Sequence, residues 1–222
     1  ATKNRHEDIQ NDDIEEAVKK VTVGLEKRER KYSEKDKKLT AYHEAGHAVV
    51  SYYLPTQANV KEVSIIPRGV AGGYTMYKSD EDKYYISKTE MQEKLIALLG
   101  GRAAEKLVLD DISTGASNDI EVATQIAKDM VTKYGMSERI GAIMYGSGQE
   151  EVFLGREFAK SKHYSEESAG IIDEETKKIV DTAYQRAETI LTEHIDKLHA
   201  VAEVLLDKEK IDGDEFDAIF AE

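Results

Sequence analysis

Two histidines four positions apart, His43 and His47, are the feature that most constrains this chain. In an α-helix, positions four apart lie on the same side, so both imidazoles can reach a single metal ion. Glu44 follows the first histidine, where its carboxylate can accept a proton from a metal-bound water. The resulting H-E-x-x-H pattern is typical of zinc peptidases. Because the pattern is short, the surrounding sequence has to support it.

The surrounding sequence predicts a helix over about residues 33–54. Ser33 is a suitable N-cap, and Pro55 ends the helical pattern. Apolar residues spaced three and four apart form one stripe: Leu39, Tyr42, Gly46, Val49 and Tyr53. The two histidines lie beside this stripe and are expected at the edge of the buried face. Gly46 is unfavourable within a helix and indicates close passage of another segment. Spacing, helix and stripe together favour a metal site over two core histidines with a surface glutamate.

The composition limits which atoms could bind the metal. The 222-residue chain contains no cysteine, which excludes a disulfide scaffold and a cysteine-based zinc site. A metal must therefore be held by histidine and carboxylate. The formal net charge of −13 argues against a nucleic-acid partner. Without a signal peptide or a run of about 18 apolar residues, nothing here is expected to span a membrane. The G-x-x-x-x-G-K-[ST] motif is also absent, so a P-loop ATP site is not expected.

The predicted elements indicate a mainly α (α+β) fold. It has a small β-sheet beside the H-E-x-x-H helix and a C-terminal helical part over about residues 160–222. Residues 1–13 are polar and expected to form a linker, followed by the folded domain, residues 14–222. Strands are predicted at 60–66 and 74–77, an acidic turn at 79–82, and an irregular glycine-rich stretch at 141–155. Further helices are predicted at 14–30, 87–107, from the 113–118 loop to Tyr134, at 173–206 and at 212–220.

Three details of these helices can be tested against the structure. The first helix is expected to bury an apolar face formed by Ile14, Val18, Val21 and Leu25. Gly100 and Gly101 are expected to kink the helix at 87–107, and the long helical run at 173–206 is expected to break near Glu193–His194.

A catalytic zinc site needs a third protein ligand. The other histidines are poor candidates, since His194 and His199 point to different faces and His6 and His163 lie in polar stretches. Asp119 is the best carboxylate candidate: it projects to the border of the buried face of its helix (Ile120, Ala123, Ala127, Met130, Tyr134), whereas Glu121 projects outward. It also lies in the first turn, where the helix dipole favours an ionised acid. A simple N-terminal acid or cap explains the position equally well.

Glu105 is the rival to Asp119. It continues the inward-facing row of its helix, and an inward acid near a metal is often the hydrogen-bond partner of a ligating histidine. Pairing with Arg102 or Lys106 is the alternative. Spacing alone leaves the choice between Asp119 and Glu105 open.

Six segments in the same order resemble the peptidase domain of the FtsH-type ATP-dependent zinc metalloproteases. They are 40–48 (TAYHEAGHA), 64–69 (SIIPRG), 100–105 (GGRAAE), 113–120 (STGASNDI), 134–137 (YGMS) and 164–167 (YSEE). The resemblance extends from residue 12 to residue 222. One departure is the 70–73 segment (VAGG), where the family more often has a bulkier residue before the second glycine.

The resemblance implies one zinc ion per chain, held by His43, His47 and Asp119, with Glu44 as the catalytic base. It also implies a homo-hexamer in which an ATPase ring, with its own ATP and Mg²⁺, is stacked on a peptidase ring. Residues 1–13 would then be the linker from that ATPase module, which is not in this sequence. Family members are usually anchored by N-terminal membrane helices, which places the peptidase at the cytoplasmic face of a bacterial inner or cell membrane.

The function expected from the sequence is a zinc endopeptidase acting on unfolded or translocated polypeptides in protein quality control. An extended substrate is expected to pair with a strand edge between Ile65 and Tyr77, with Ile65, Gly72, Gly73 and Tyr74 as candidate contacts. The alternative is a catalytically silent, metal-stabilised scaffold for ring assembly. The intact Glu44 favours the enzyme, because a scaffold has no use for that base.

Overall fold

The H-E-x-x-H segment forms α2 (Glu34–Tyr52), a helix at the centre of the computed structural model, which describes residues 8–26, 33–69, 71–78, 84–145 and 164–221. Ser33 caps it, accepting a hydrogen bond from the Asp36 backbone N–H at 3.1 Å. Every residue from Ala41 to Ser51 is buried. The expectation of one apolar stripe with the histidines at its edge is therefore wrong: neighbouring elements surround the helix, and the histidines are buried with it.

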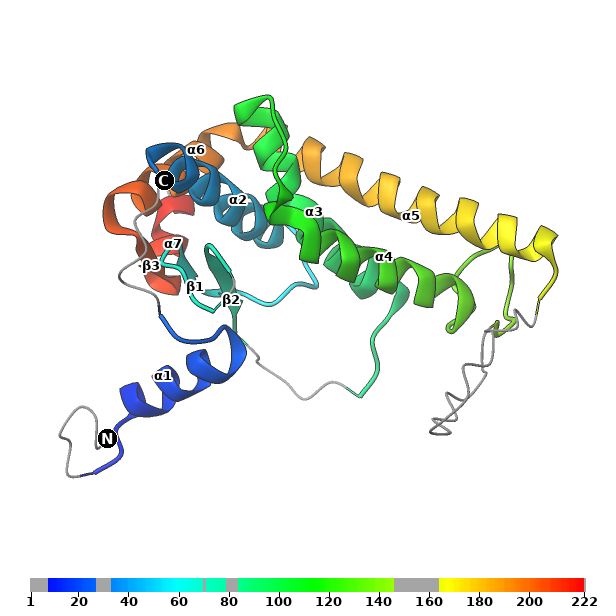
Figure 1. Cartoon of the computed structure of the whole chain (residues 1–222), viewed down its shortest axis with the longest axis horizontal. Coiled ribbons are helices and arrows are strands. Elements are labelled where there is room, and N and C mark those ends of the chain that lie inside the picture. Colours follow the sequence, from blue (N-terminus) through cyan, green and yellow to red (C-terminus); the bar gives the residue numbers. More distant parts are fainter. Residues whose placement is uncertain (1–7, 27–32, 70, 79–83, 146–163, 222) are drawn as a thin grey trace.

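Helices pack against α2 from several directions. α3 (Lys88–Leu109) and α6 (Ile195–Lys208) make its main contacts, and α5 (Glu166–Glu193) packs on α3. α4 (Ser117–Thr132) follows a short 3-10 turn, η2 (Thr114–Ala116), and packs against both α3 and α5. Figure 1 shows α5 (yellow) extending beside α4 (green), with α6, α7 (Gly213–Phe220) and the sheet gathered at the other end. The fold is mainly helical, as predicted.

Glycines allow α2 and α3 to approach closely. A Cβ on Gly46 would lie 2.5 Å from the Gly100 carbonyl oxygen, and one on Gly100 would lie 2.7 Å from the Gly46 carbonyl oxygen. The expected close passage at Gly46 is thus confirmed. α3 is assigned as one helix from Lys88 to Leu109, so the consecutive glycines at 100 and 101 provide space for backbone and histidine rings where the sequence indicated a kink.

A three-stranded antiparallel sheet lies against α2 and α7. Its order is β2 (Tyr74–Tyr77), β1 (Val60–Ser64), β3 (Lys210–Asp212). The small sheet beside the metal helix is confirmed, but β3 was not predicted. Three residues are too few to show an alternating pattern, and β3 is defined by its pairing with β1, in which Val63 faces Ile211.

Several helix predictions need correction. α5 begins at Glu166, seven residues before the predicted start, because Ser165 provides an N-cap. The break near Glu193–His194 is confirmed, since α6 begins at Ile195. On α4 the central residues of the predicted face are buried, but Ile120 and Tyr134 are exposed, and the helix ends at Thr132.

The first helix also differs from its prediction. α1 (Asn11–Thr22) starts inside the expected linker, and its apolar residues are exposed, with Val21 at 87%. Charged residues attach it to the sheet instead: the amine of Lys19 lies 2.6 Å from the Glu62 carboxylate, and Arg68 forms two hydrogen bonds with Glu16.

Some predicted segments fall outside the described residues: the first seven linker positions, the acidic turn at 79–82 and most of the glycine-rich stretch at 141–155. Among the helices described, none combines the length and apolar character needed to cross a membrane.

Candidate active site

Three side chains converge on one point beside α2. His43 Nε2 and His47 Nε2 lie 3.1 Å apart, and Asp119 Oδ2 at the start of α4 lies 3.3 Å and 3.5 Å from them. His43 and His47 come from successive turns of one helix, while the η2 turn and the start of α4 bring Asp119 to them. The structure thus brings together all three residues expected to hold a metal.

The triangle of donor atoms fits a tetrahedral zinc site. With metal–ligand bonds of about 2.0–2.1 Å, two corners of a tetrahedron are separated by about 3.3 Å. The observed separations of 3.1, 3.3 and 3.5 Å all lie close to this value. Two imidazoles and one carboxylate leave one tetrahedral position open, which is the arrangement of a catalytic zinc site. These three side chains can hold one metal ion.

Hydrogen bonds on the far side of each ring aim the histidines at this point. His43 Nδ1 lies 2.7 Å from Glu105 Oε1, and His47 Nδ1 lies 2.8 Å from the Ala97 carbonyl oxygen. Because the oxygens accept from the Nδ1–H groups, both Nε2 atoms are left free as ligands. Glu105 is fully buried and also accepts from the Ser113 N–H at 2.7 Å.

Glu105 therefore lies behind His43, as one reading of the sequence predicted. The alternative partner Lys106 instead pairs with Asp110 at 2.7 Å. Asp119 lies with the Nε2 atoms, so the geometry separates the two acids: Asp119 faces the converging nitrogens, and Glu105 faces the opposite side of the His43 ring.

The electrostatics of this group call for a cation. Burial alone would lower the pKa of His43, but hydrogen bonds to Asp119 and Glu105 raise it to about 10. Burial would raise the pKa of Asp119, yet its hydrogen bonds to both histidines hold it well below its ordinary value. Asp119 thus stabilises positive charge where the imidazoles meet, and Glu105 does so from the far side of the His43 ring. A divalent metal ion satisfies the same demand.

Glu44 lies next to this triangle with its carboxylate against the sheet. It is 6% exposed, and Thr75 Oγ1 on β2 donates a hydrogen bond to Glu44 Oε2 at 2.9 Å. Burial raises the pKa of Glu44, opposed by the charges of His43 and His47. Gly73 makes room for the side chain, because a Cβ there would lie 2.8 Å from Glu44 Oε1.

A cleft of about 800 Å³ contains these groups. His43, Glu44, His47 and Asp119 line it together with residues 71–75. Of the candidate substrate contacts, Gly72, Gly73 and Tyr74 line the cleft. Ile65 does not: it is buried directly after the central strand, where its N–H donates to the Glu209 carbonyl at 2.9 Å. Within the described part of the chain, β2 has a strand on one side only, so its other edge faces outward.

The remaining histidines lie away from the cleft or outside the described residues. His199 Nδ1 is 2.9 Å from the Tyr42 hydroxyl, and the His194 ring stacks on Tyr53 with centroids 3.6 Å apart. His6 and His163 are not among the described residues.

Comparison with known proteins places the chain in a family. The model of peptidase family M41 matches residues 30–219. The chain belongs to this family. Over 208 residues, 94% of its length, the M41 chain is 60% identical to proteins named ATP-dependent zinc metalloprotease FtsH 1 from Thermoanaerobacter sp. and ATP-dependent zinc metalloprotease FtsH from Caldicellulosiruptor bescii. It is 49% identical over 211 residues, 95% of its length, to the FtsH of Thermotoga maritima.

The M41 chain spans about a third of the length of these relatives: 34% of the first two and 35% of the third. The resemblance inferred from the six sequence segments is confirmed.

Sequence reasoning missed three groups of this M41 site: the Ala97 carbonyl, Ser113 and Thr75. A backbone carbonyl carries no sequence signal. Ser113 lies in a segment that reads as a loop, and Thr75 in a strand that reads as structural, so neither pattern indicates its contact with Glu105 or Glu44.

Proposed function

We propose that this M41 domain is a zinc endopeptidase that hydrolyses unfolded polypeptides. The observation that carries the proposal is the convergence of His43, His47 and Asp119 on one point, with the Glu44 carboxylate beside them in the same cleft. When bound there, zinc supplies an acidified water and a Lewis acid for the scissile carbonyl.

Each chain residue has a separate task in this scheme. His43, His47 and Asp119 would hold the metal, while Glu105 and the Ala97 carbonyl keep both histidines in the tautomer that presents Nε2. Glu44 accepts the proton of the attacking water and delivers it to the nitrogen of the leaving amine. Because Glu44 is buried, few solvent molecules other than the attacking water can exchange protons with its carboxylate. A scaffold would not need such an acid in the cleft.

The substrate would bind as an extended strand along the outer edge of β2. Main-chain pairing there depends little on side chains, which suits a peptidase with many unfolded substrates. Gly72, Gly73 and Tyr74 line the cleft at this edge and are the proposed contacts. Ile65 does not line the cleft and is therefore not one of the proposed substrate contacts.

For a full-length protein we propose assembly as a hexamer, coupling to an ATPase module and anchoring at the cytoplasmic face of a membrane. The support is the family membership together with the names of the relatives, which describe them as ATP-dependent. We also propose residues 1–13 as the linker and residues 14–222 as the peptidase domain, with the end of the linker already within α1, which begins at Asn11.

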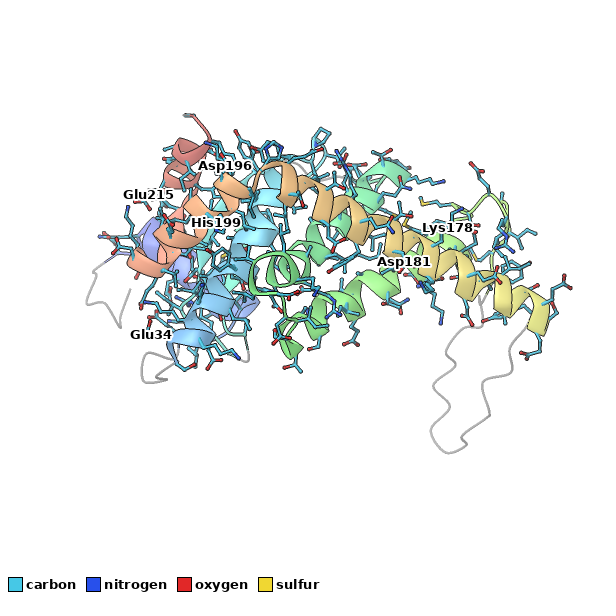
Figure 2. The ribbon with its side chains drawn as sticks, turned by 90° about the horizontal axis from the view of Figure 1, so that it is seen from above. Glu34, Lys178, Asp181, Asp196, His199 and Glu215 are labelled. Atoms are coloured by element: carbon cyan, nitrogen blue, oxygen red, sulfur yellow. The ribbon has the colours of Figure 1, made fainter. Side chains whose placement is uncertain are left out.

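The substitution Glu44→Gln tests the function. It preserves shape and leaves the metal-binding side chains untouched, but it removes the basic carboxylate. Casein hydrolysis should fall by about 10²–10⁴-fold or more, while zinc per chain should be unchanged. Glu34→Gln, at the exposed first turn of the same helix (Figure 2), should behave like the wild type. Full activity of Glu44→Gln with zinc bound would remove Glu44 from the mechanism, and loss of zinc would make it a ligand.

A further inference from the structure

The Glu44 carboxylate lies against β2. Its Oε2 contacts Thr75 on that strand, and its Oε1 lies next to Gly73, the residue that precedes the strand. Thr75 Oγ1 donates to Oε2 at 2.9 Å, whereas its distance to the Glu44 backbone carbonyl oxygen is 3.4 Å. Gly73 lies two positions earlier and so faces the same side of the strand. A Cβ on Gly73 would lie 2.8 Å from both Oε1 and Cγ of Glu44. One oxygen is therefore held by a hydroxyl, and the other lies against a bare Cα.

We propose that Thr75 is a positioning residue that fixes the orientation of the Glu44 carboxylate for proton transfer. This inference rests on the proposed peptidase function. Glutamate has three rotatable side-chain bonds, and a general base works only within hydrogen-bond reach of the proton it accepts. A buried carboxylate also needs a donor to compensate for lost hydration. The Thr75 hydroxyl meets both needs, because it compensates one oxygen and restricts the rotation of the group.

The position of Thr75 also connects the base to the substrate. Thr75 pairs with Val63 on the central strand, which fixes the inner edge of β2. The outer edge of the same strand is the proposed site of substrate pairing. The single strand β2 would thus position both the scissile peptide, along its outer edge, and the Glu44 carboxylate, through Thr75. Loss of the hydroxyl should consequently reduce kcat and leave substrate binding, measured by KM, largely unchanged.

The experiment compares Thr75→Val with Thr75→Ser in the zinc-loaded chain, using a fluorogenic peptide. Valine has the shape of threonine but no hydroxyl, so kcat should fall about tenfold or more while KM stays within about twofold. Zinc content should match the wild type, and the variant should remain folded at the assay temperature. Serine retains the hydroxyl and should restore kcat to within about threefold. Thr182→Val is the matched control, since that exposed hydroxyl on α5 donates to the carbonyl of Lys178, a residue far along the helix from α2 (Figure 2).

The results separate this inference from the proposed function. Wild-type kcat in Thr75→Val would overturn the positioning role, as would a loss of zinc or an equal loss of kcat in the serine variant. A crystal structure of Thr75→Val gives a readout that does not depend on turnover. A reoriented Glu44 carboxylate supports the inference, and an unchanged one overturns it. A zinc-loaded wild type that cleaves nothing would instead reject the peptidase proposal.

Discussion

Asp119 is the residue on which the metal site depends most, because among the described residues its carboxylate is the one that faces both histidine Nε2 atoms. Asp119→Asn keeps the size of the side chain and removes its negative charge, so the two imidazoles lose their anionic co-ligand. We expect zinc per chain after dialysis to fall well below one and peptide hydrolysis to drop below detection. Glu121→Gln, an exposed acid two positions later on α4, is the control and should retain both. Full zinc content in Asp119→Asn would exclude Asp119 as a ligand.

Glu105 should have a milder effect, because it reaches the metal site only through the His43 ring. In Glu105→Gln the side-chain oxygen can still accept from His43 Nδ1, but the charge that increases the basicity of the imidazole is lost. A change of this kind costs about 10–100-fold in metal affinity. Competition with a fluorescent zinc chelator measures this difference, while activity at saturating zinc should remain. A larger loss of affinity than that of Asp119→Asn would reverse the two assignments.

At the scale of elements, one of the contacts that attach α1 to the sheet is centred on a buried carboxylate, Glu62. Lys19, Lys210 and the Tyr74 hydroxyl all reach it, at 2.6, 2.8 and 2.6 Å. Burial alone would raise the pKa of Glu62, but these hydrogen bonds hold it below its ordinary value of 4.5. The ionised form is thus favoured in the folded state, and its stabilisation is present above about pH 4.5 and lost as the pH falls through the folded pKa.

Glu62→Gln should therefore reduce the free energy of unfolding by roughly 1.5–3 kcal/mol at pH 7. The difference from the wild type should shrink as the pH is lowered below 4.5, because Glu62 is protonated first in the unfolded state and then, through its lower pKa, in the folded state. Denaturant unfolding at pH 7 and pH 4 measures both effects. Glu15→Gln breaks the exposed pair with Lys61 (3.3 Å) and should cost only about 0–1 kcal/mol at either pH. An equal effect of Glu62→Gln at both pH values would show that its charge is not the cause.

Elements with local signals were predictable from the sequence, and those defined by tertiary contacts were not. Ser33 and Ser87 cap α2 and α3 through side-chain hydrogen bonds that depend only on nearby residues, so both starts could be read directly. β3 exists because β1 pairs with it, and no periodicity within three residues reveals that. In the same way, the spacing of His43 and His47 indicated two ligands, but spacing could not choose between Asp119 and Glu105. The family resemblance favoured Asp119, and the way α3 and α4 approach α2 gives the physical reason.

At the scale of the whole molecule, the cleft is bounded by α2, the start of α4 and β2, so an extended peptide must lie between these elements to reach Glu44. A stably folded protein offers no such free strand. The sequence contains no P-loop motif with which ATP could be coupled to unfolding. We expect the 222-residue chain to digest casein but not a tightly folded protein, at a rate that ATP does not change. Gel-based digestion of both substrates with and without ATP and Mg²⁺ checks this. Unfolding the resistant substrate beforehand should make it cleavable, because this exposes the strand that β2 can pair with; ATP-stimulated digestion of the folded form would contradict the mechanism.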